Sequence, residues 1–499
     1  MSALLVLPVL IPLAAAVVLV PWRSIGPQRW LALIATAIQA GVALALVAGV
    51  GHEPAVYAVG GWQPPHGIVL VADRLSALMV ALTVALALAA LVYAVQGDDD
   101  RGRTFHPLFQ FQLAGLAMAF LTGDLFNLFV AFEVLLIASY GLLLHGGGGR
   151  RHRVGFQYVI LNLAGSLLFL VALGLLYRVA GTLNMADLGA ALPALEGTAR
   201  AVAQAAVLLL VAVFGLKAAA FPLSVWLAST YSAVLAPVAA LFAIMTKVGV
   251  YALLRLDATV LAGVDFGVAS ILHYAGLATV AAGAVGVLAA ERLSLLVSYL
   301  LLVSVGTLLL ALGVPGGGGW HGGLFYLIHT TLVTGGLYLL AGIMARQRVP
   351  LDDGLQAGAP LAQPVLMGGL FALAAVAVIG LPPLSGFLGK VLILQAPLAQ
   401  GVSFVGLWLA LLGSGLVMLF TLAAAGSTLF WKQGMPAGPQ RSSPLGAVAS
   451  AAVLVAAPVV LALAAAPVDR WLAAAAEDLQ RPAVYRAAVL GEADPGGAP

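Results

Sequence analysis

The 499-residue sequence contains no cysteine and few charged residues. Without cysteine, the chain cannot form disulfides, thiol redox centres or thiolate-bound iron–sulfur clusters. Charged residues make up 8% of the chain, whereas about 25% is usual for a soluble protein. Because so few charges cannot cover a surface that faces water, the composition excludes a soluble enzyme, a nucleic-acid-binding protein and a disordered scaffold.

Apolar residues are abundant, at 63% of the chain, and the mean hydropathy is +1.10. Apolar runs of about 20 residues recur along the whole sequence, as is typical of an α-helical protein that crosses the membrane many times. We predict an all-α polytopic membrane protein with about 14 spans. These lie at residues 3–21, 30–50, 74–95, 107–122, 124–145, 155–178, 202–221, 236–255, 267–290, 293–312, 321–345, 365–399, 403–431 and 446–466.

The distribution of basic residues predicts how the spans are oriented. If the N-terminus lies outside, twelve basic residues fall in inner loops and four in outer loops, before the tail is counted. This excess follows the positive-inside rule, and an even number of spans then places both termini outside. The inner set is Arg23, Arg29, Arg101, Arg103, Arg150, Arg151, Arg153, Arg292, Arg346, Arg348, Lys432 and Arg441, and the outer set is Arg74, Arg178, Arg200 and Arg255.

The two ends of the sequence differ from its middle. The span at 3–21 has no basic segment before it and no clear cleavage site, so we interpret it as a retained helix rather than a signal peptide. After residue 466, charged residues alternate with small apolar ones, which predicts a helix lying on the membrane interface. We expect residues 492–499 to be disordered.

A few charged residues lie inside the apolar spans. All 18 arginines are at span ends, in loops or in the tail, but three of the four lysines, Lys217, Lys247 and Lys390, lie deep in spans. Glu133 is the one acid clearly in mid-span, and Asp124 lies at a helix start. Arginine keeps its proton inside a protein, whereas a buried lysine can release it. Since a charge at the bilayer centre costs roughly 2.5–3.5 kcal/mol, the pattern favours a proton path over snorkelling or structural ion pairs.

Other polar residues in the spans support this path less directly. His329, beside Thr330, Thr331 and Thr334, titrates near neutrality and can bridge distant lysines, although a hydrogen-bonded packing role is the alternative. His273 has no polar neighbours in its span and is the weaker candidate. The remaining polar residues either hold water or bond within and between helices. They are Ser294, Ser298, Ser304 and Thr307 in one span and Asn162 and Ser166, one turn apart, in another.

Proline interrupts two predicted spans, and a lysine accompanies each interruption. A Leu-Pro-Pro-Leu segment at 381–384 breaks the twelfth span near Lys390, and Phe221-Pro222 ends the seventh near Lys217. Irregular backbone at membrane depth is tolerated only inside protein or beside water. Interrupted helices in corresponding positions indicate a transport site built on inverted repeats. We expect spans four to eight and nine to thirteen to be these repeats, with five spans in each. Because five is an odd number, the second repeat must be inverted relative to the first.

These same residues carry a family resemblance. The segment TGDLFNLFVAFEVLLIASY at 122–140 closely resembles the fifth helix of the D-type subunits of Mrp-type multisubunit Na⁺(K⁺)/H⁺ antiporters. The superfamily also includes antiporter-like membrane subunits of respiratory complex I and of membrane-bound hydrogenases. The resemblance to this family extends over nearly the whole chain. Further matching segments are GLKAAAFPL at 215–223, TKVGVYALLR at 246–255, GLPPLSGFLGK at 380–390, GTLNMADL at 181–188 and the tail at 485–491.

The resemblance implies a 14-helix fold, two inverted five-helix repeats, and broken seventh and twelfth helices. By position, Glu133 is the ion-pair acid of the fifth helix, Lys217 is its partner, Lys247 is the central relay lysine and Lys390 is the terminal lysine. The resemblance also implies a bacterial inner membrane, large and small partner subunits, and no cofactor. The implied segments are a three-helix unit at 1–100, a first repeat at 101–258, a second repeat at 259–434, and a C-terminal helix and tail at 435–499.

The chain departs from this family at two positions. Thr334 stands where the family usually has a lysine in helix eleven, and Ala228 stands where it usually has a proline after Trp226-Leu227. The missing lysine leaves His329 or water to connect Lys247 with Lys390.

We therefore predict a proton-translocating subunit of a multisubunit Na⁺ or K⁺/proton antiporter, not an enzyme, with a relay through Glu133, Lys217, Lys247, His329 and Lys390. One alternative is a proton-pumping membrane subunit of a complex I-like or hydrogenase-like redox complex. The others are a stand-alone solute carrier and a structural remnant whose altered helix eleven no longer conducts. A Na⁺ cage needs several hard oxygen ligands, so Asp124 near Glu133 is only a weak metal candidate, which leaves open that the cation crosses in a partner subunit.

Overall fold

The computed structural model describes residues 2–348, 351–358, 360–399, 405–432 and 442–491. The predicted disorder of 492–499, the inner-loop residue Arg441 and the start of the span at 403–431 lie outside these residues. The helices are α1 Leu7–Leu19, α2 Ile25–Gly49, α3 Arg74–Ala94, α4 Phe105–Leu121, α5 Leu125–Leu144, α6 Gly149–Ala180, α7 Met185–Ala191, α8 Gly197–Ala218, α9 Leu227–Tyr231, α10 Ala236–Phe242, α11 Met245–Arg255, α12 Val268–Ala289, α13 Leu293–Leu312, α14 Trp320–Gln347, α15 Pro364–Ile379, α16 Ser385–Ala399, α17 Val405–Phe430, α18 Leu445–Leu463, α19 Ala465–Leu479 and α20 Pro482–Leu490. A π-helical turn, Leu256–Val260, extends α11, and strands β1 Ala55–Ala58 and β2 Val69–Ala72 form an antiparallel hairpin.

Most predicted spans correspond to helices that can cross a membrane. Eleven helices in the described ranges are long and apolar enough to do so. The other three predicted spans fall on shorter apolar helices, namely α1, α4 and the α15–α16 pair. The prediction of an all-α polytopic membrane protein is confirmed, and the number of 14 crossings stays a prediction.

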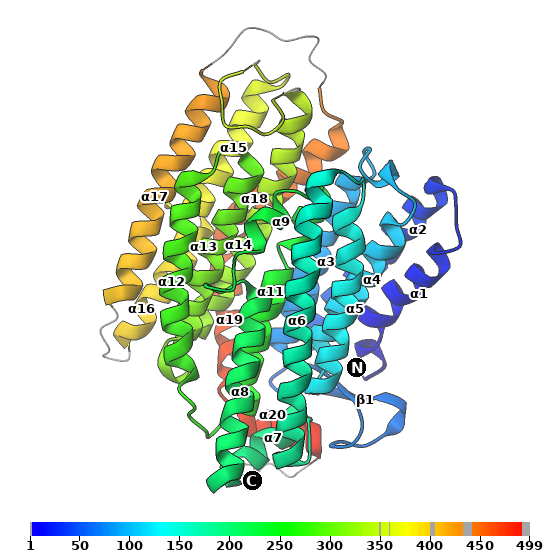
Figure 1. Ribbon diagram of the computed structural model, residues 1–499, viewed down its shortest axis with the longest axis vertical. Coiled ribbons are helices and arrows are strands. Elements are labelled where there is room, and N and C mark those ends of the chain that lie inside the picture. Colours follow the sequence, from blue (N-terminus) through cyan, green and yellow to red (C-terminus); the bar gives the residue numbers. More distant parts are fainter. Residues whose placement is uncertain (1, 349–350, 359, 400–404, 433–441, 492–499) are drawn as a thin grey trace.

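The helices form a bundle along the long axis of the molecule (Figure 1). The early helices α1–α5 lie on one side of the bundle and α12, α16 and α17 lie on the other. The segment 236–260, which contains α10 and α11, is completely buried, and α13 and α14 are nearly so. Since these helices are apolar on all sides, they can fill the centre of the bundle, and α11 and α14 carry Lys247 and His329 there.

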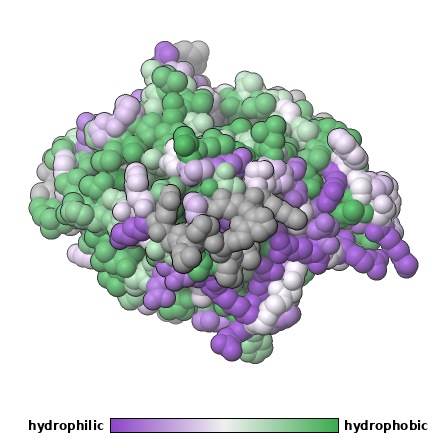
Figure 2. Space-filling view, turned by 90° about the horizontal axis from the view of Figure 1, so that it is seen from above, coloured by the Kyte–Doolittle hydropathy of each residue, from purple (hydrophilic) through white to green (hydrophobic). Residues whose placement is uncertain are grey.

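Charged residues gather at the two ends of the bundle. At the upper end of Figure 1, arginines predicted on the inner side pair with aspartates of neighbouring loops: Arg29 with Asp99, and Arg346 with Asp98. Seen from above, hydrophilic residues extend from near the middle of this end toward the right and lower edges, and hydrophobic residues cover its upper and left parts (Figure 2). Such a distribution is typical of an end that meets water and sides that meet lipid.

The opposite end is closed by the C-terminal tail. Where the sequence predicted one interfacial helix, two helices form, α19 and α20. Tyr485 and Val489 of α20 pack on Val69 and Val71 of β2 and on Ala186 of α7. A place at the membrane interface stays a prediction for these helices.

Both predicted helix breaks are present, and their caps are alike. After α8, Ala219 adopts a left-handed conformation with φ of +62°, and the Ala220 N–H donates to the Gly215 carbonyl at 2.8 Å. After α15, Gly380 has φ of +83°, and the Leu381 N–H donates to the Val376 carbonyl at 3.1 Å. Each is a Schellman cap, which satisfies carbonyls that the end of the helix leaves free. A cis proline follows each cap, at Pro222 and Pro383.

A second pair of features relates the two halves of the chain. Asp124, just before α5, forms an antiparallel bridge with Asn184, and Arg292, just before α13, forms one with Gly354. The first bridge lies beside α7 at the lower end of Figure 1, whereas Arg292 lies with the upper arginines, so α5 and α13 start at opposite ends. Inverted repeats predict this relation, and the repeats themselves stay a prediction.

One span differs from its prediction. The sequence predicts a continuous helix at 236–255, but α10 ends at Phe242 and α11 begins at Met245. Neither proline nor glycine stands at 243–244, so the residues give no signal of this break. Its consequence is that Lys247 lies in the first turn of α11.

Candidate functional site

Lys217, the second-last residue of α8, reaches across to α6. It is 5% exposed, and its ammonium Nζ donates to the Asn162 carbonyl at 3.2 Å, to Asn162 Oδ1 at 3.3 Å and to Ser166 Oγ at 3.4 Å. Nζ also lies 5.8 Å from the centre of the Phe132 ring on α5. Glu133 follows Phe132, but within the described ranges it forms no ion pair with Lys217, and its Oε1 is buried without a hydrogen-bond partner. The predicted pair is therefore open in this structure.

Lys247 is fully buried at the start of α11. Its Nζ donates to Ser304 Oγ of α13 at 3.3 Å. Ser304, Ser298 and Thr307 each donate their hydroxyl to a carbonyl of α13 itself, which is one of the two roles that the sequence left open for them. The ammonium of Lys247 thus has a neutral oxygen as its partner, and no carboxylate pairs with it in the part of the chain that the structure describes.

Lys390 lies across the break between α15 and α16. Its Nζ donates to the carbonyl of Ile379, the last residue of α15, at 2.7 Å. Helix C-termini carry partial negative charge and free carbonyls, so the ammonium is held by the broken end of the helix. His329 of α14 reaches the same break, because its Nδ1 lies 2.9 Å from Ser385 Oγ, at the start of α16. The structure therefore brings His329 and Lys390 to one broken helix.

Two threonines follow His329 on α14 with buried hydroxyls. Thr330 and Thr334 are each 1% exposed. Thr330 lies within reach of the Tyr326 side chain one turn earlier, whereas Thr334 Oγ1 has no hydrogen-bond partner among the described residues. Buried hydroxyls without a partner are rare, and ordered water is the usual partner of such groups. His273, the second histidine candidate, lies on α12 with its ring against Tyr274 at 5.6 Å.

Asp124 takes a structural position. It caps the N-terminus of α5, where its Oδ1 accepts from the Asn127 N–H at 2.8 Å. Burial raises the pKa of Asp124, and hydrogen bonds from the backbone at Asn127 and Phe126 oppose this rise. Among the described residues no three His, Asp or Glu side chains come together as a metal site would require.

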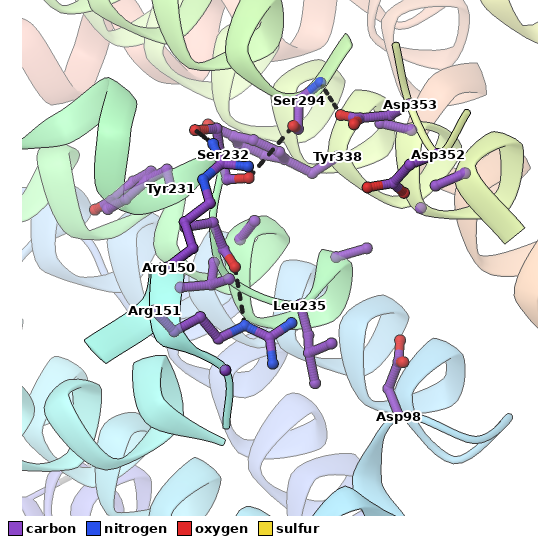
Figure 3. Close-up of a pocket in the computed structure, with 18 of the residues that line it drawn as sticks. Asp98, Arg150, Arg151, Tyr231, Ser232, Leu235, Ser294, Tyr338, Asp352 and Asp353 are labelled. Carbon is purple, nitrogen blue, oxygen red and sulfur yellow. Dashed lines mark hydrogen bonds between the residues drawn. The ribbon is translucent and has the colours of Figure 1, made fainter. Parts of the chain in front are cut away.

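A cavity of about 570 Å³ lies at the upper end, among the starts of α6 and α13 and the ends of α3 and α14. We call it the arginine vestibule. Figure 3 shows Arg150 extending from α6 toward Ser232, with Ser294 and Tyr338 beside it. Its charged lining residues are Arg101, Arg150, Arg151, Arg292, Arg346, Asp98, Asp352 and Asp353.

Several parts of these sites were not predicted from the sequence. Ser385 lies five residues before Lys390 and follows the proline pair, so its spacing is a signal that was available. The Ile379 carbonyl has no side-chain signal, because a helix break exposes whichever carbonyl precedes it. The arginine vestibule draws on loops far apart in the sequence, which only the fold brings together.

Protonatable side chains buried in apolar helices, two of them at broken helices, define a membrane protein that moves ions. The comparisons with known proteins agree. Residues 122–419 match the family model described as NADH:quinone oxidoreductase/Mrp antiporter, TM. The chain belongs to this family of membrane subunits.

Individual relatives match the chain along nearly its whole length. It is 40% identical to the D-type subunit of a probable K⁺/H⁺ antiporter of Rhizobium meliloti (strain 1021), over 98% of this chain and 97% of the relative. It is 34% identical to the D-type subunit of a Na⁺/H⁺ antiporter of Bacillus subtilis (strain 168), over 99% of this chain and 100% of the relative. Its structure is similar to that of a chain in the Mrp complex from Dietzia sp. DQ12-45-1b, with a TM-score of 0.89, 27% identity and coverage of 98% and 100%.

Proposed function

We propose that this chain is the proton-translocating D-type subunit of a multisubunit Na⁺ or K⁺/proton antiporter. The observation that carries the proposal is that three lysines are buried in apolar helices and that their hydrogen-bond partners among the described residues are all neutral oxygens. A permanently charged ammonium in such a place is costly, whereas an ammonium that gives up its proton avoids that cost for part of each cycle. The names of the relatives, as K⁺/H⁺ and Na⁺/H⁺ antiporter subunits, support a transporter rather than an enzyme.

The first half of the proposed relay is a switch between Glu133 and Lys217. When the carboxylate approaches Lys217, it stabilises the charged ammonium, and when it withdraws, the lysine gives up its proton toward Lys247. The open arrangement, with Lys217 on Asn162 and Ser166 of α6, supports the released state of this switch. The partners on α6 keep the lysine hydrogen-bonded while no ion pair with Glu133 is formed.

The second half of the proposed relay runs from Lys247 through His329 to Lys390. The unpartnered hydroxyl of Thr334 on α14 supports a path in which water takes the place of the lysine that the family usually has at this position. His329 then passes the proton across the break to Lys390. No cation site is part of this proposal, and the cation is assigned to a partner subunit.

The setting of the protein is part of the same proposal. We infer a bacterial inner membrane, both termini outside, the four segments given above, and other membrane subunits of a hetero-oligomeric complex. The separation of the predicted inner and outer arginines to opposite ends of the bundle supports the orientation. The subunit names of the relatives support the partners.

A second candidate is a proton-pumping membrane subunit of a redox-driven complex. The description of the matching family supports this candidate, because it names NADH:quinone oxidoreductase beside the Mrp antiporter. Neighbouring genes for iron–sulfur subunits would support the redox complex, whereas neighbouring genes for small antiporter subunits would support the antiporter.

The switch is tested by changing Glu133→Gln in the whole complex. Because the amide has nearly the same shape but carries no charge, we expect normal assembly and a loss of Na⁺/H⁺ or K⁺/H⁺ exchange of at least about tenfold. Exchange is measured in everted membrane vesicles by the collapse of a pH gradient when the cation is added. Glu196→Gln, at the exposed start of α8, is the matched control. Normal exchange by the Glu133 variant would overturn the switch.

A further inference from the structure

The arginine vestibule carries more positive than negative charge. Five arginines and three aspartates line it. A cavity that lies at the end of a proton-conducting subunit repels cations if this excess remains uncompensated. The partners of each charged group therefore decide what the vestibule can hold.

The three aspartates are already engaged. Asp98 pairs with Arg101 at 3.1 Å and with Arg346 at 2.5 Å. Arg292 binds Asp352 at 2.6 Å and Asp353 at 2.5 Å. These pairs engage all the carboxylates of the lining. Arg150 and Arg151 form no ion pair, although Asp352 and Asp353 still attract the Arg150 guanidinium from a greater distance.

The two remaining arginines stand at the N-terminus of α6. Arg151 donates to three backbone carbonyls, those of Ala233 at 2.9 Å, His145 at 3.0 Å and Gly147 at 3.1 Å. Arg150 donates from Nη2 to Ser232 Oγ at 3.1 Å, and no carboxylate of the described residues pairs with it. Arg150 therefore has free guanidinium donors beside a cavity, and Figure 3 shows it extending along that cavity toward Ser232.

Two further features of the lining favour an anion. The first N–H groups of α6 have no partner within the helix, and this long helix directs the positive end of its dipole to the same place. Tyr93 also lines the cavity, is fully buried, and its hydroxyl has no hydrogen-bond partner among the described residues. A ligand with several acceptor oxygens would satisfy the donors of both the arginine and the tyrosine.

We propose that the arginine vestibule is a binding site for a phosphate group, with Arg150 as its main ligand. A guanidinium fork matches the oxygens of phosphate, and basic pockets between membrane helices commonly receive phospholipid head groups. The starts and ends of the spans that form the vestibule lie where head groups lie in a bilayer. Free phosphate from the adjacent solution has the same chemistry and is the second source of the ligand.

The test measures binding by the purified full-length chain in dodecyl maltoside, a detergent that contains no phosphate. One arm titrates radiolabelled inorganic phosphate, and the other adds phosphatidylglycerol and counts the retained lipid by native mass spectrometry. Arg150→Gln should weaken binding about tenfold or more, since it removes the charge-assisted hydrogen bonds of the guanidinium to the phosphate oxygens. Arg150→Lys should restore part of the affinity. Arg153→Gln, one turn further along α6, exposed and outside the lining, should bind as the wild type does.

The outcomes separate the sources. Dependence on Arg150 in the lipid arm alone identifies a lipid head group, and dependence in the phosphate arm alone identifies a soluble phosphate. If neither probe binds more weakly to Arg150→Gln than to Arg153→Gln, the site does not exist. Because binding is measured without an ion gradient or partner subunits, this result is independent of whether the chain carries protons.

Discussion

At the scale of single residues, the choice between lysine and arginine organises this protein. Every arginine lies at a span end, in a loop or in the tail, where a permanent charge can meet water or a carboxylate. Arg255, for example, is buried but holds Asp73 through two hydrogen bonds of 2.5 and 2.8 Å. Lys217, Lys247 and Lys390 instead have uncharged partners. The residue that can lose its proton thus occupies the places where a fixed charge would be most costly.

His329 provides a testable prediction at the residue scale. His329→Gln keeps a hydrogen-bonding side chain toward Ser385 but cannot take up a proton, so exchange by the complex should fall at least about tenfold. A second change, Thr334→Lys, puts a lysine where the family usually has one, and it should restore part of the exchange to the His329 variant. Both are measured in everted vesicles with matched amounts of complex. Unchanged exchange in His329→Gln would show that water alone completes the path. Failure of Thr334→Lys to improve exchange would contradict the bridging role proposed for α14.

At the scale of elements, the broken helices position the lysines. The Schellman caps at Ala219 and Gly380 end two helices at membrane depth, and Lys390 holds a carbonyl that the second break sets free. Broken helices of this kind are stable only because protein or water satisfies their backbone. The path and the breaks are therefore parts of one arrangement.

Gly380→Ala tests this arrangement. The methyl group of an alanine at this position would lie 2.9 Å from Lys390 Cδ. The alanine backbone would also have to adopt the left-handed conformation, which costs about 1–2 kcal/mol. We expect a lower melting temperature of the detergent-purified complex and reduced exchange, because Lys390 must move from the Ile379 carbonyl. The matched change Ala219→Gly should not lower the melting temperature, since glycine adopts the same conformation without strain. Equal stability and exchange in Gly380→Ala and the wild type would contradict the account of this break.

The elements also show which features the sequence could predict. Hydropathy located the spans, and proline located the breaks after α8 and α15, because both signals act through neighbouring residues. The break before α11 has neither proline nor glycine and depends on tertiary packing. The Lys217 ammonium forms its hydrogen bonds with α6 and no ion pair with Glu133. The spacing of residues in the sequence does not predict which of these two partners the lysine binds. Strand β2 was not predicted because its four residues are all apolar and buried, so they lack the alternation that marks a strand.

At the scale of the whole molecule, the charge distribution predicts the orientation in the membrane. Arginines predicted on the inner side meet around the arginine vestibule, whereas Arg74 pairs with Asp478 of the tail and Arg255 with Asp73 at the other end. The sequence predicted which residues share a side, but not that they would enclose a cavity.

The absence of cysteine makes this orientation directly measurable. Ser24→Cys, in an exposed loop predicted inside, should react with a membrane-impermeant maleimide only in everted vesicles. Gly51→Cys, where a side chain has open space, should react only in intact cells or right-side-out vesicles. The wild-type chain is the blank for both. The reverse pattern would place both termini inside and contradict the positive-inside assignment.

The most direct test of the account is cation/proton exchange by the whole complex carrying Lys217→Arg. If the lysine must alternate between protonation states, arginine should abolish exchange nearly as completely as Lys217→Ala, because its charge is permanent. Lys432→Arg, at the exposed end of α17, should leave exchange unchanged. Full exchange by Lys217→Arg in everted vesicles would mean that a fixed positive charge is enough, and the proton relay would be wrong.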